Sequence, residues 1–244
     1  MSIDASLHQR RRALTAGELD AIPWIHLLAP QERERAVADL KIAEASPGEY
    51  VCRMGRPATY WFGVVDGLLK MSSDNEQGQT MTFTGVPPGG WFGEGTALKR
   101  EAYRYNIQPL RNSHVAGLHV DTFHWLLDHS IGFNRFIMNQ LNERLGQFIA
   151  AREIDRMTNP DIRVARSLAT LFNPVLYPGV GEVLRITQQE LAYLVGLSRQ
   201  RVNEALTTLS EQGSIRVEYG GLRVLDLPAL RSHVFSKQKS MPTV

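Results

Sequence analysis

The stretch ITQQELAYLVGLSRQRVNEALTTLSEQGSI, residues 186–215, decides the fold of the C-terminal third of the chain. Thr187 and Glu190 have the spacing of a capping box, which predicts that a helix begins there. Gly196 then supplies the tight turn between two helices that cross steeply. Ser198 is a good N-cap for the second helix. Together these signals predict a helix-turn-helix.

The second helix of this pair has two distinct faces. Val202, Leu206 and Leu209 form its apolar stripe, and Gly213 suits the position that ends it. The opposite face is polar near the N-terminus, the end that a recognition helix inserts into the major groove of DNA. The residues of this region expected to contact DNA are Thr187, Ser198, Arg199, Gln200, Arg201, Asn203 and Glu204.

A β-hairpin is predicted directly after these helices, with Gly220 and Gly221 at its turn. A hairpin in this position is a wing, and Arg216 and Arg223 are placed on it for contacts with DNA phosphates. The alternative is an ordinary helical hairpin with exposed polar residues. The caps, the central glycine, the polar face and the wing together favour a DNA-binding module.

The composition of the chain limits the class of protein to which it can belong. The chain has 244 residues, of which 43% are hydrophobic and 21% charged, as in ordinary soluble globular proteins. Its net charge of +2 is compatible with nucleic acid but does not by itself predict it. No stretch approaches the roughly 18 to 20 apolar residues of a membrane span. The N-terminus lacks the apolar region of a secretory signal, so a cytoplasmic location without membrane contact is expected.

The N-terminal half has a different pattern of residue types. Thr15 with Glu18 predicts a short helix, and a second helix is expected to start at Pro30. Residues 50–118 are rich in β-branched and aromatic side chains and are punctuated by glycines, which predicts short strands in a compact antiparallel roll. Residues 74–78 form a polar hairpin tip.

A helical pattern covers residues 121–159. Within it Met138, Leu141, Leu145 and Phe148 recur at spacings of three, four and three, which is an a/d seam. We interpret these four residues as a dimer interface, because the seam is narrow and lies on a long helix between two different halves. The alternative is an amphipathic helix that packs on its own roll.

The predicted fold class is therefore α+β with three parts. Residues 1–120 form N-terminal helices and an antiparallel, jelly-roll-like β-roll that acts as a sensor domain. Residues 121–159 form a central dimerisation helix, and residues 160–244 form a winged helix-turn-helix domain.

These motifs resemble the Crp/Fnr regulators, whose helix-turn-helix reads roughly TxxELAxxxGxSRxxVxxxLxxLxxxG. This chain fills the pattern from Thr187 to Gly213. YWFGVVDG at 60–67 and GGWFGE at 89–94 are similar to that family's cyclic-nucleotide-binding β-roll and to the entry of its phosphate-binding cassette. The resemblance implies a transcription regulator that binds a palindromic operator in double-stranded DNA as a homodimer. It also implies RNA polymerase as a partner.

The resemblance also implies an effector site. In members that bind cyclic AMP, a cassette glutamate holds the ribose and an Arg-Ser pair clamps the phosphate. Glu94 fits the glutamate and Arg104 the arginine, but Tyr105 takes the place of the serine. Phe148 and Ile149 stand where such proteins place a Thr-Ser pair against adenine. The expected effector-contacting residues are Gly93, Glu94, Arg104, Tyr105, Phe148 and Ile149.

Cyclic AMP in the family's usual pose is disfavoured, because both polar contacts to the base and one to the phosphate are missing. A different effector, such as a cyclic dinucleotide or a small organic acid, and no effector at all both stay open. An alternative role for Glu94 and Arg104 is a structural ion pair that closes the cassette loop. Cys52 is the only cysteine, which excludes an iron–sulfur cluster, and no metal site is expected.

Two other classes of function were weighed. Catalysis is disfavoured, because no nucleophile elbow, metal-ligand set or phosphate loop accompanies Glu94 and Arg104. A nucleotide-sensing interaction module without DNA binding would leave Arg199 and the wing arginines without a role. The sequence therefore favours a DNA-binding regulator that is not an enzyme.

Overall fold

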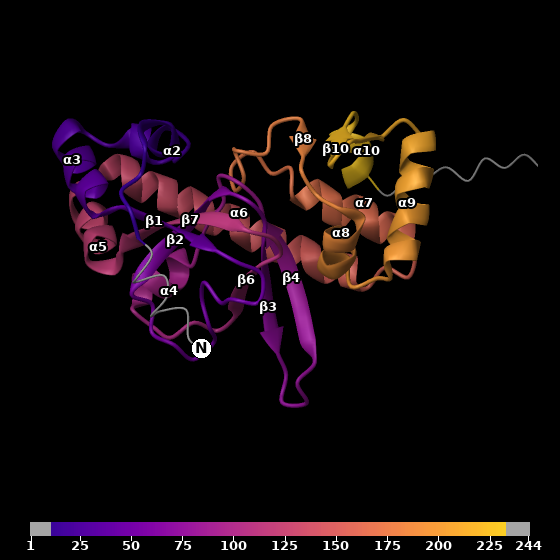
Figure 1. Ribbon diagram of the computed structural model, residues 1–244, viewed down its shortest axis with the longest axis horizontal. Coiled ribbons are helices and arrows are strands. Elements are labelled where there is room, and N and C mark those ends of the chain that lie inside the picture. The colour runs from indigo at the N-terminus through magenta and orange to yellow at the C-terminus, as the bar shows by residue number, and fades with distance from the viewer. Residues whose placement is uncertain (1–10, 233–244) are drawn as a thin grey trace, which may run out of the picture.

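The computed structural model describes residues 11–232 (Figure 1). A β-roll with small helices occupies one end, and a helical domain with a small sheet occupies the other. The long helix α6 (Ile131–Asp155) runs along the roll to the helical domain (Figure 1). The predicted α+β class, with an antiparallel roll, a long helix and a winged helix-turn-helix, is confirmed.

The roll consists of two antiparallel sheets. The four-stranded sheet has the order β1 (Lys41–Ala45), β7 (Ser113–His119), β2 (Tyr60–Asp66), β5 (Trp91–Phe92). The three-stranded sheet has the order β4 (Thr80–Val86), β3 (Leu69–Asp74), β6 (Asn106–Pro109). The first strand lies before residue 50, where the sequence predicted the strands to begin. It has only five residues, so its pattern gives little periodicity.

The β3–β4 hairpin projects from the roll (Figure 1). Asn75 closes its tip, because its side-chain oxygen accepts hydrogen bonds from the backbone N–H groups of Gln77 and Gln79. Gly78 has φ = 74°, a value that favours glycine. The predicted hairpin tip is therefore confirmed.

Three short helices cover one side of the roll: α2 (Ala16–Asp20), the 3₁₀ turn η1 (Ile25–Leu27) and α3 (Pro30–Asp39). Thr15 and Glu18 form the predicted capping box of α2, and Pro30 opens α3 as predicted. Between them Trp24 is fully buried against Trp61, Trp91 and Phe133, with ring centroids 5.2–5.5 Å apart. This aromatic cluster binds the N-terminal helices to the roll.

The predicted single helix over residues 121–159 is wrong at Ser130. The chain forms α5 (Val120–His129) and then α6, and Ser130 lies between them with an extended backbone. The Ser130 hydroxyl accepts a hydrogen bond from the N–H of Phe133 (3.3 Å) and so caps α6. A serine cap inside an apolar helical pattern therefore divided one expected helix into two.

The C-terminal domain begins with α7 (Pro160–Thr170), which Asn159 caps. The predicted helix-turn-helix is formed by α8 (Gln188–Val195) and α9 (Arg199–Glu211), with Gly196 at φ = 66° between them. The wing pairs β9 (Ile215–Glu218) with β10 (Gly221–Val224). Two elements were not predicted: β8 (Val183–Leu184), which adds a third strand to the wing, and α10 (Leu227–Arg231). Both are too short to show a period.

Part of the sequence analysis concerns residues outside the described range. The segment examined for a secretory signal lies mainly within residues 1–10, and the C-terminal tail begins at residue 233. Within residues 11–232, no helix combines the length and the apolar character needed to cross a membrane.

Candidate DNA interface and sensor pocket

The outer edge of the helical domain is formed by α9, away from the roll (Figure 1). Val202, Leu206 and Leu209 are buried beneath it, and Arg199, Gln200 and Asn203 are exposed at its N-terminal end. The structure therefore brings these three predicted DNA-contacting side chains together on one open face. The partial positive charge of the helix N-terminus adds to the charge of Arg199.

Other predicted contacts are engaged within the protein. Arg201 donates to Asp161 on α7 (Nη2–Oδ1, 2.7 Å) and to Glu204 (Nη1–Oε2, 2.8 Å). Glu204 also accepts a hydrogen bond from the side-chain amide of Gln200 (3.3 Å). Arg201 thus ties α9 to α7, and the negative charge of Glu204 is met by Arg201. Both side chains are thus engaged in ion pairs within the protein.

The remaining two residues of the predicted set act as helix caps. The hydroxyl of Thr187 accepts a hydrogen bond from the N–H of Glu190 (3.1 Å), and that of Ser198 accepts from the N–H of Arg201 (3.2 Å). Gln188, which the sequence analysis did not single out, donates to the side-chain oxygen of Asn203 (2.7 Å). Gln188 therefore orients the Asn203 amide on the open face.

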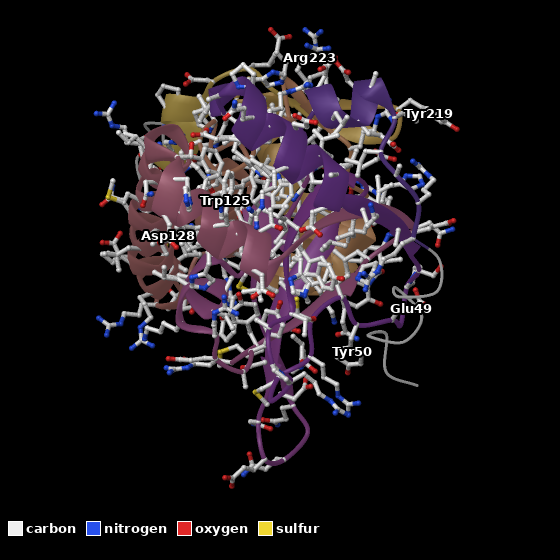
Figure 2. All side chains as sticks on the ribbon, turned by 90° about the vertical axis from the view of Figure 1, so that its left-hand side faces the viewer. Glu49, Tyr50, Trp125, Asp128, Tyr219 and Arg223 are labelled. Carbon is white, nitrogen blue, oxygen red and sulfur yellow. The ribbon has the colours of Figure 1, made fainter. Side chains whose placement is uncertain are left out.

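The wing presents its two arginines differently. Arg216 is exposed, as expected for a phosphate contact. Arg223 lies at the rim of the molecule with Tyr219 (Figure 2), but it donates to Glu218 (2.6 Å) and to Glu182 (2.5 Å). The hydrogen bond to Glu218 is the main cause that raises the pKa of Arg223 above its ordinary value. The structure thus gives Arg223 two carboxylate partners, whereas the expected contact of Arg223 with phosphate stays a prediction.

A pocket of about 250 Å³ lies between the roll and α6. Five of the six expected effector-contacting residues line it: Gly93, Glu94, Arg104, Tyr105 and Phe148. The sixth, Ile149, is 57% exposed and lies outside the lining. The structure therefore gathers the cassette residues at one cavity but directs Ile149 to solvent.

The expected Glu94–Arg104 ion pair is wrong. Arg104 bonds to Glu101 (Nη2–Oε2, 2.9 Å), and its side chain is 74% exposed. Glu94, 4% exposed, is paired instead with Arg144 of α6 (Nε–Oε1, 3.4 Å). Arg104 follows the cassette helix α4 (Glu94–Lys99) on the outer surface, where a local carboxylate is nearer.

Arg144 is the functional residue that the sequence analysis missed. Besides Glu94, its guanidinium donates to the carbonyl oxygen of Trp91 (2.7 Å), to Gln147 (3.2 Å) and to the hydroxyl of Tyr177 (3.1 Å). The sequence contains a pattern that indicates this residue. Gln140, Arg144 and Gln147 lie four and three residues apart, so they share one polar face of the helix.

Burial and charge act in opposite directions on Arg144. Burial tends to lower its pKa, but the neighbouring Tyr177 and Glu94 raise it, and the net pKa lies above the ordinary value. The guanidinium is therefore a permanent cation beside the pocket. Burial is also the main cause that raises the pKa of Tyr105, so its hydroxyl stays protonated. That hydroxyl would lie 3.5 Å from a Cβ built on Gly93, so the tyrosine occupies cassette space.

The predicted dimer residues do not all share one environment. Met138 and Leu145 are 60% and 61% exposed, and Phe148 is exposed at the pocket rim. Leu141 is half-buried and faces the pocket. Ile131 and Ile149, which the sequence analysis did not assign to the seam, are also exposed. The open apolar stripe of α6 thus consists of Ile131, Met138, Leu145, Phe148 and Ile149.

Two family models match the chain. Residues 43–130 match the cyclic nucleotide-binding domain, and residues 162–233 match the Crp-like helix-turn-helix domain. The first region contains the roll with the Glu94 cassette, and the second contains α8, α9 and the wing.

Curated relatives and solved structures agree with these models. Transcriptional regulator SdrP of Thermus thermophilus is 28% identical over 70% of this chain and 81% of its own. The cyclic AMP receptor protein of the same organism is 24% identical over 87% of this chain and 97% of its own. The structure of FixK2 from Bradyrhizobium japonicum has a similar fold, with a TM-score of 0.62 at 15% identity over 78% of this chain and 95% of that one.

The buried ion pair yields a first prediction. Arg144→Met leaves Glu94 buried without its cation, which should lower the free energy of unfolding by about 3–5 kcal/mol. Glu94→Gln combined with Arg144→Met removes both charges and should recover a large part of that loss. Denaturant unfolding followed by circular dichroism measures both variants. Equal losses in the single and double variants would contradict the pairing.

Proposed function

The chain belongs to the Crp/Fnr family of transcription regulators, and we propose that it binds a palindromic operator as a homodimer through α9. The observation that supports this most directly is the open N-terminal face of α9, where Arg199, Gln200 and Asn203 project from a helix whose other face is buried. Such a helix end is what enters the major groove in helix-turn-helix proteins.

The open face suggests how bases are read. The fork of Arg199 suits guanine O6 and N7, which it can bind with two hydrogen bonds. The amide of Gln200 suits adenine. The carboxylate oxygens of Glu204 accept hydrogen bonds, here from Arg201, and do not supply the donor that a second guanine would need. We therefore infer one strongly specified guanine in each half-site, with Arg216 of the wing on phosphate.

We propose that two copies pair through the open apolar stripe of α6. Exposed apolar patches on a soluble protein mark interaction surfaces, and a helix along the molecular edge is suited to two-fold pairing. Two-fold symmetry implies half-sites about one helical turn apart. In this proposal residues 1–120 sense, 121–159 dimerise and 160–244 bind DNA, with RNA polymerase as a partner in the cytoplasm.

We propose that the cassette pocket takes a small molecule other than cyclic AMP in the family's usual pose. Glu94 is already paired with Arg144, Arg104 faces outward, and Tyr105 occupies cassette space. The alternative is a regulator that needs no effector. It is supported by the Arg144 network, which joins the cassette to Tyr177 without a ligand.

A second prediction concerns base recognition. Selection from a random DNA library should recover a palindrome, and Arg199→Ala should cost about 1–3 kcal/mol per half-site and relax the preference at one guanine. Arg216→Ala should weaken binding to all sequences and flatten the salt dependence. Arg223→Ala is the matched control, because its charge is balanced by Glu182 and Glu218. An unchanged guanine preference in Arg199→Ala would show that another face reads DNA.

A third prediction concerns the dimer. Met138→Asp with Leu145→Asp places two charges in each half of the proposed interface, where desolvation costs several kcal/mol. Because both side chains are exposed in the single chain, the variant should remain folded. Analytical ultracentrifugation should show monomers, with unchanged circular dichroism. A variant that stays dimeric would exclude this stripe as the interface.

A fourth prediction concerns the effector. Calorimetry with cyclic AMP should show no appreciable heat of binding, and the nucleotide should leave operator affinity unchanged. The reason is that the phosphate-clamping positions carry an outward Arg104 and a half-buried Tyr105. A saturable signal that Arg104→Ala abolishes would contradict this assignment.

A further inference from the structure

The roll and the helix-turn-helix touch directly. Gly85 of β4 faces Leu194 of α8 and Leu171, and a Cβ on Gly85 would lie 2.8 Å and 3.0 Å from their methyl carbons. Nearby, a Cβ on Gly89 would lie 2.5 Å from the backbone nitrogen of Gly179. The two surfaces therefore approach closely at Gly85 and at Gly89.

Arg111, in the turn between β6 and β7, spans this contact. Its Nη1 lies 3.1 Å from both carboxylate oxygens of Glu190 on α8. Its Nη2 donates to the carbonyl oxygen of Arg185 (2.7 Å) and approaches that of Gly67 (3.4 Å). The side chain of Arg111 is 32% exposed and that of Glu190 is 9% exposed. Solvent and salt therefore screen this ion pair less than a pair on the surface.

The carboxylate held by Arg111 also starts the helix-turn-helix. Glu190 Oε2 accepts a hydrogen bond from the N–H of Thr187 (2.7 Å), which completes the capping box of α8. Gly196 then joins α8 to α9 by a single tight turn. A constraint on Glu190 is therefore a constraint on the direction of the recognition helix relative to the roll.

We propose that Arg111 is a positioning residue that sets the half-site spacing the dimer accepts. The inference rests on the proposed homodimer and palindromic operator. Each α9 is held to its own roll by the Arg111–Glu190 pair, and the two rolls are held together through α6. The distance and angle between the two recognition helices are then fixed. One inserted base pair moves a half-site by about 3.4 Å and turns it by roughly one tenth of a helical turn.

Loss of the ion pair should release this constraint without altering the reading face. The helical domain would then be held without an ion pair to the roll, by the contacts at Gly85 and Gly89 and by its contacts with α6. A DNA-binding domain that is held less firmly binds a single half-site as before. Once one domain of the dimer is bound, however, the other meets its half-site at a lower effective concentration. Such a dimer also tolerates a changed spacing better.

The test uses the full-length chain and the palindrome selected from random DNA. Three duplexes are compared: the native spacing, one inserted base pair, and one half-site scrambled. Arg111→Ala should bind the native operator about tenfold more weakly and the single half-site within about twofold of wild type. The penalty of the inserted base pair should shrink at least about fivefold. Glu190→Gln should act alike, because its amide oxygen can still cap α8 while the charge is lost.

Two further variants make the outcome decisive. Gly85→Val displaces Leu194 without touching a charge and should relax the spacing in the same way. Arg12→Ala removes an ion pair with Glu18 far from α8 and should leave all three affinities unchanged. Wild-type spacing preference in Arg111→Ala, or equal losses on single and paired half-sites, would overturn the inference. A wild-type chain that selects no palindrome would instead overturn the proposed function.

Discussion

The guanidinium of Arg144 is buried, and the groups that satisfy it come from three parts of the chain. Glu94 and the Trp91 carbonyl belong to the cassette, Gln147 to α6 itself, and Tyr177 to the segment after α7. A buried cation without such partners costs several kcal/mol, so these segments must meet around it. This requirement fixes the orientation of α6. That orientation in turn decides which side chains of α6 line the pocket and which form its open apolar stripe.

The same network limits what the pocket can do. Glu94 is buried and paired with Arg144, so a ligand that bonds to it competes with an internal ion pair. Tyr177 shares that arginine and is itself buried against the roll. Glu94, Arg144 and Tyr177 therefore join the cassette to the edge of the helical domain through groups in direct contact. The Arg111–Glu190 pair is a second connection, separate from α6.

Local signals predicted the helix-turn-helix and its wing well, because caps and a glycine turn act within a few residues. The break at Ser130 shows the limit, since a serine in an apolar helical run can cap a new helix or remain inside one. Ion pairs were predicted poorly. Arg201 and Arg223 have carboxylate partners that only the fold brings near, and Arg104 pairs with its neighbour Glu101 and not with Glu94. Arg144 was missed because the seam analysis followed only the apolar residues of its helix.

Helix α6 has polar residues on its buried face and apolar residues on its exposed face. Its buried face holds Gln140, Arg144 and Gln147, whereas its exposed face holds Met138 and Leu145. A helix on the surface of a single soluble chain normally has the opposite arrangement. The buried polar groups are explained by the cassette and by Val175 and Tyr177, to which they donate. The exposed apolar groups have no such explanation within residues 11–232, and a second copy of the same stripe would cover them with matching chemistry.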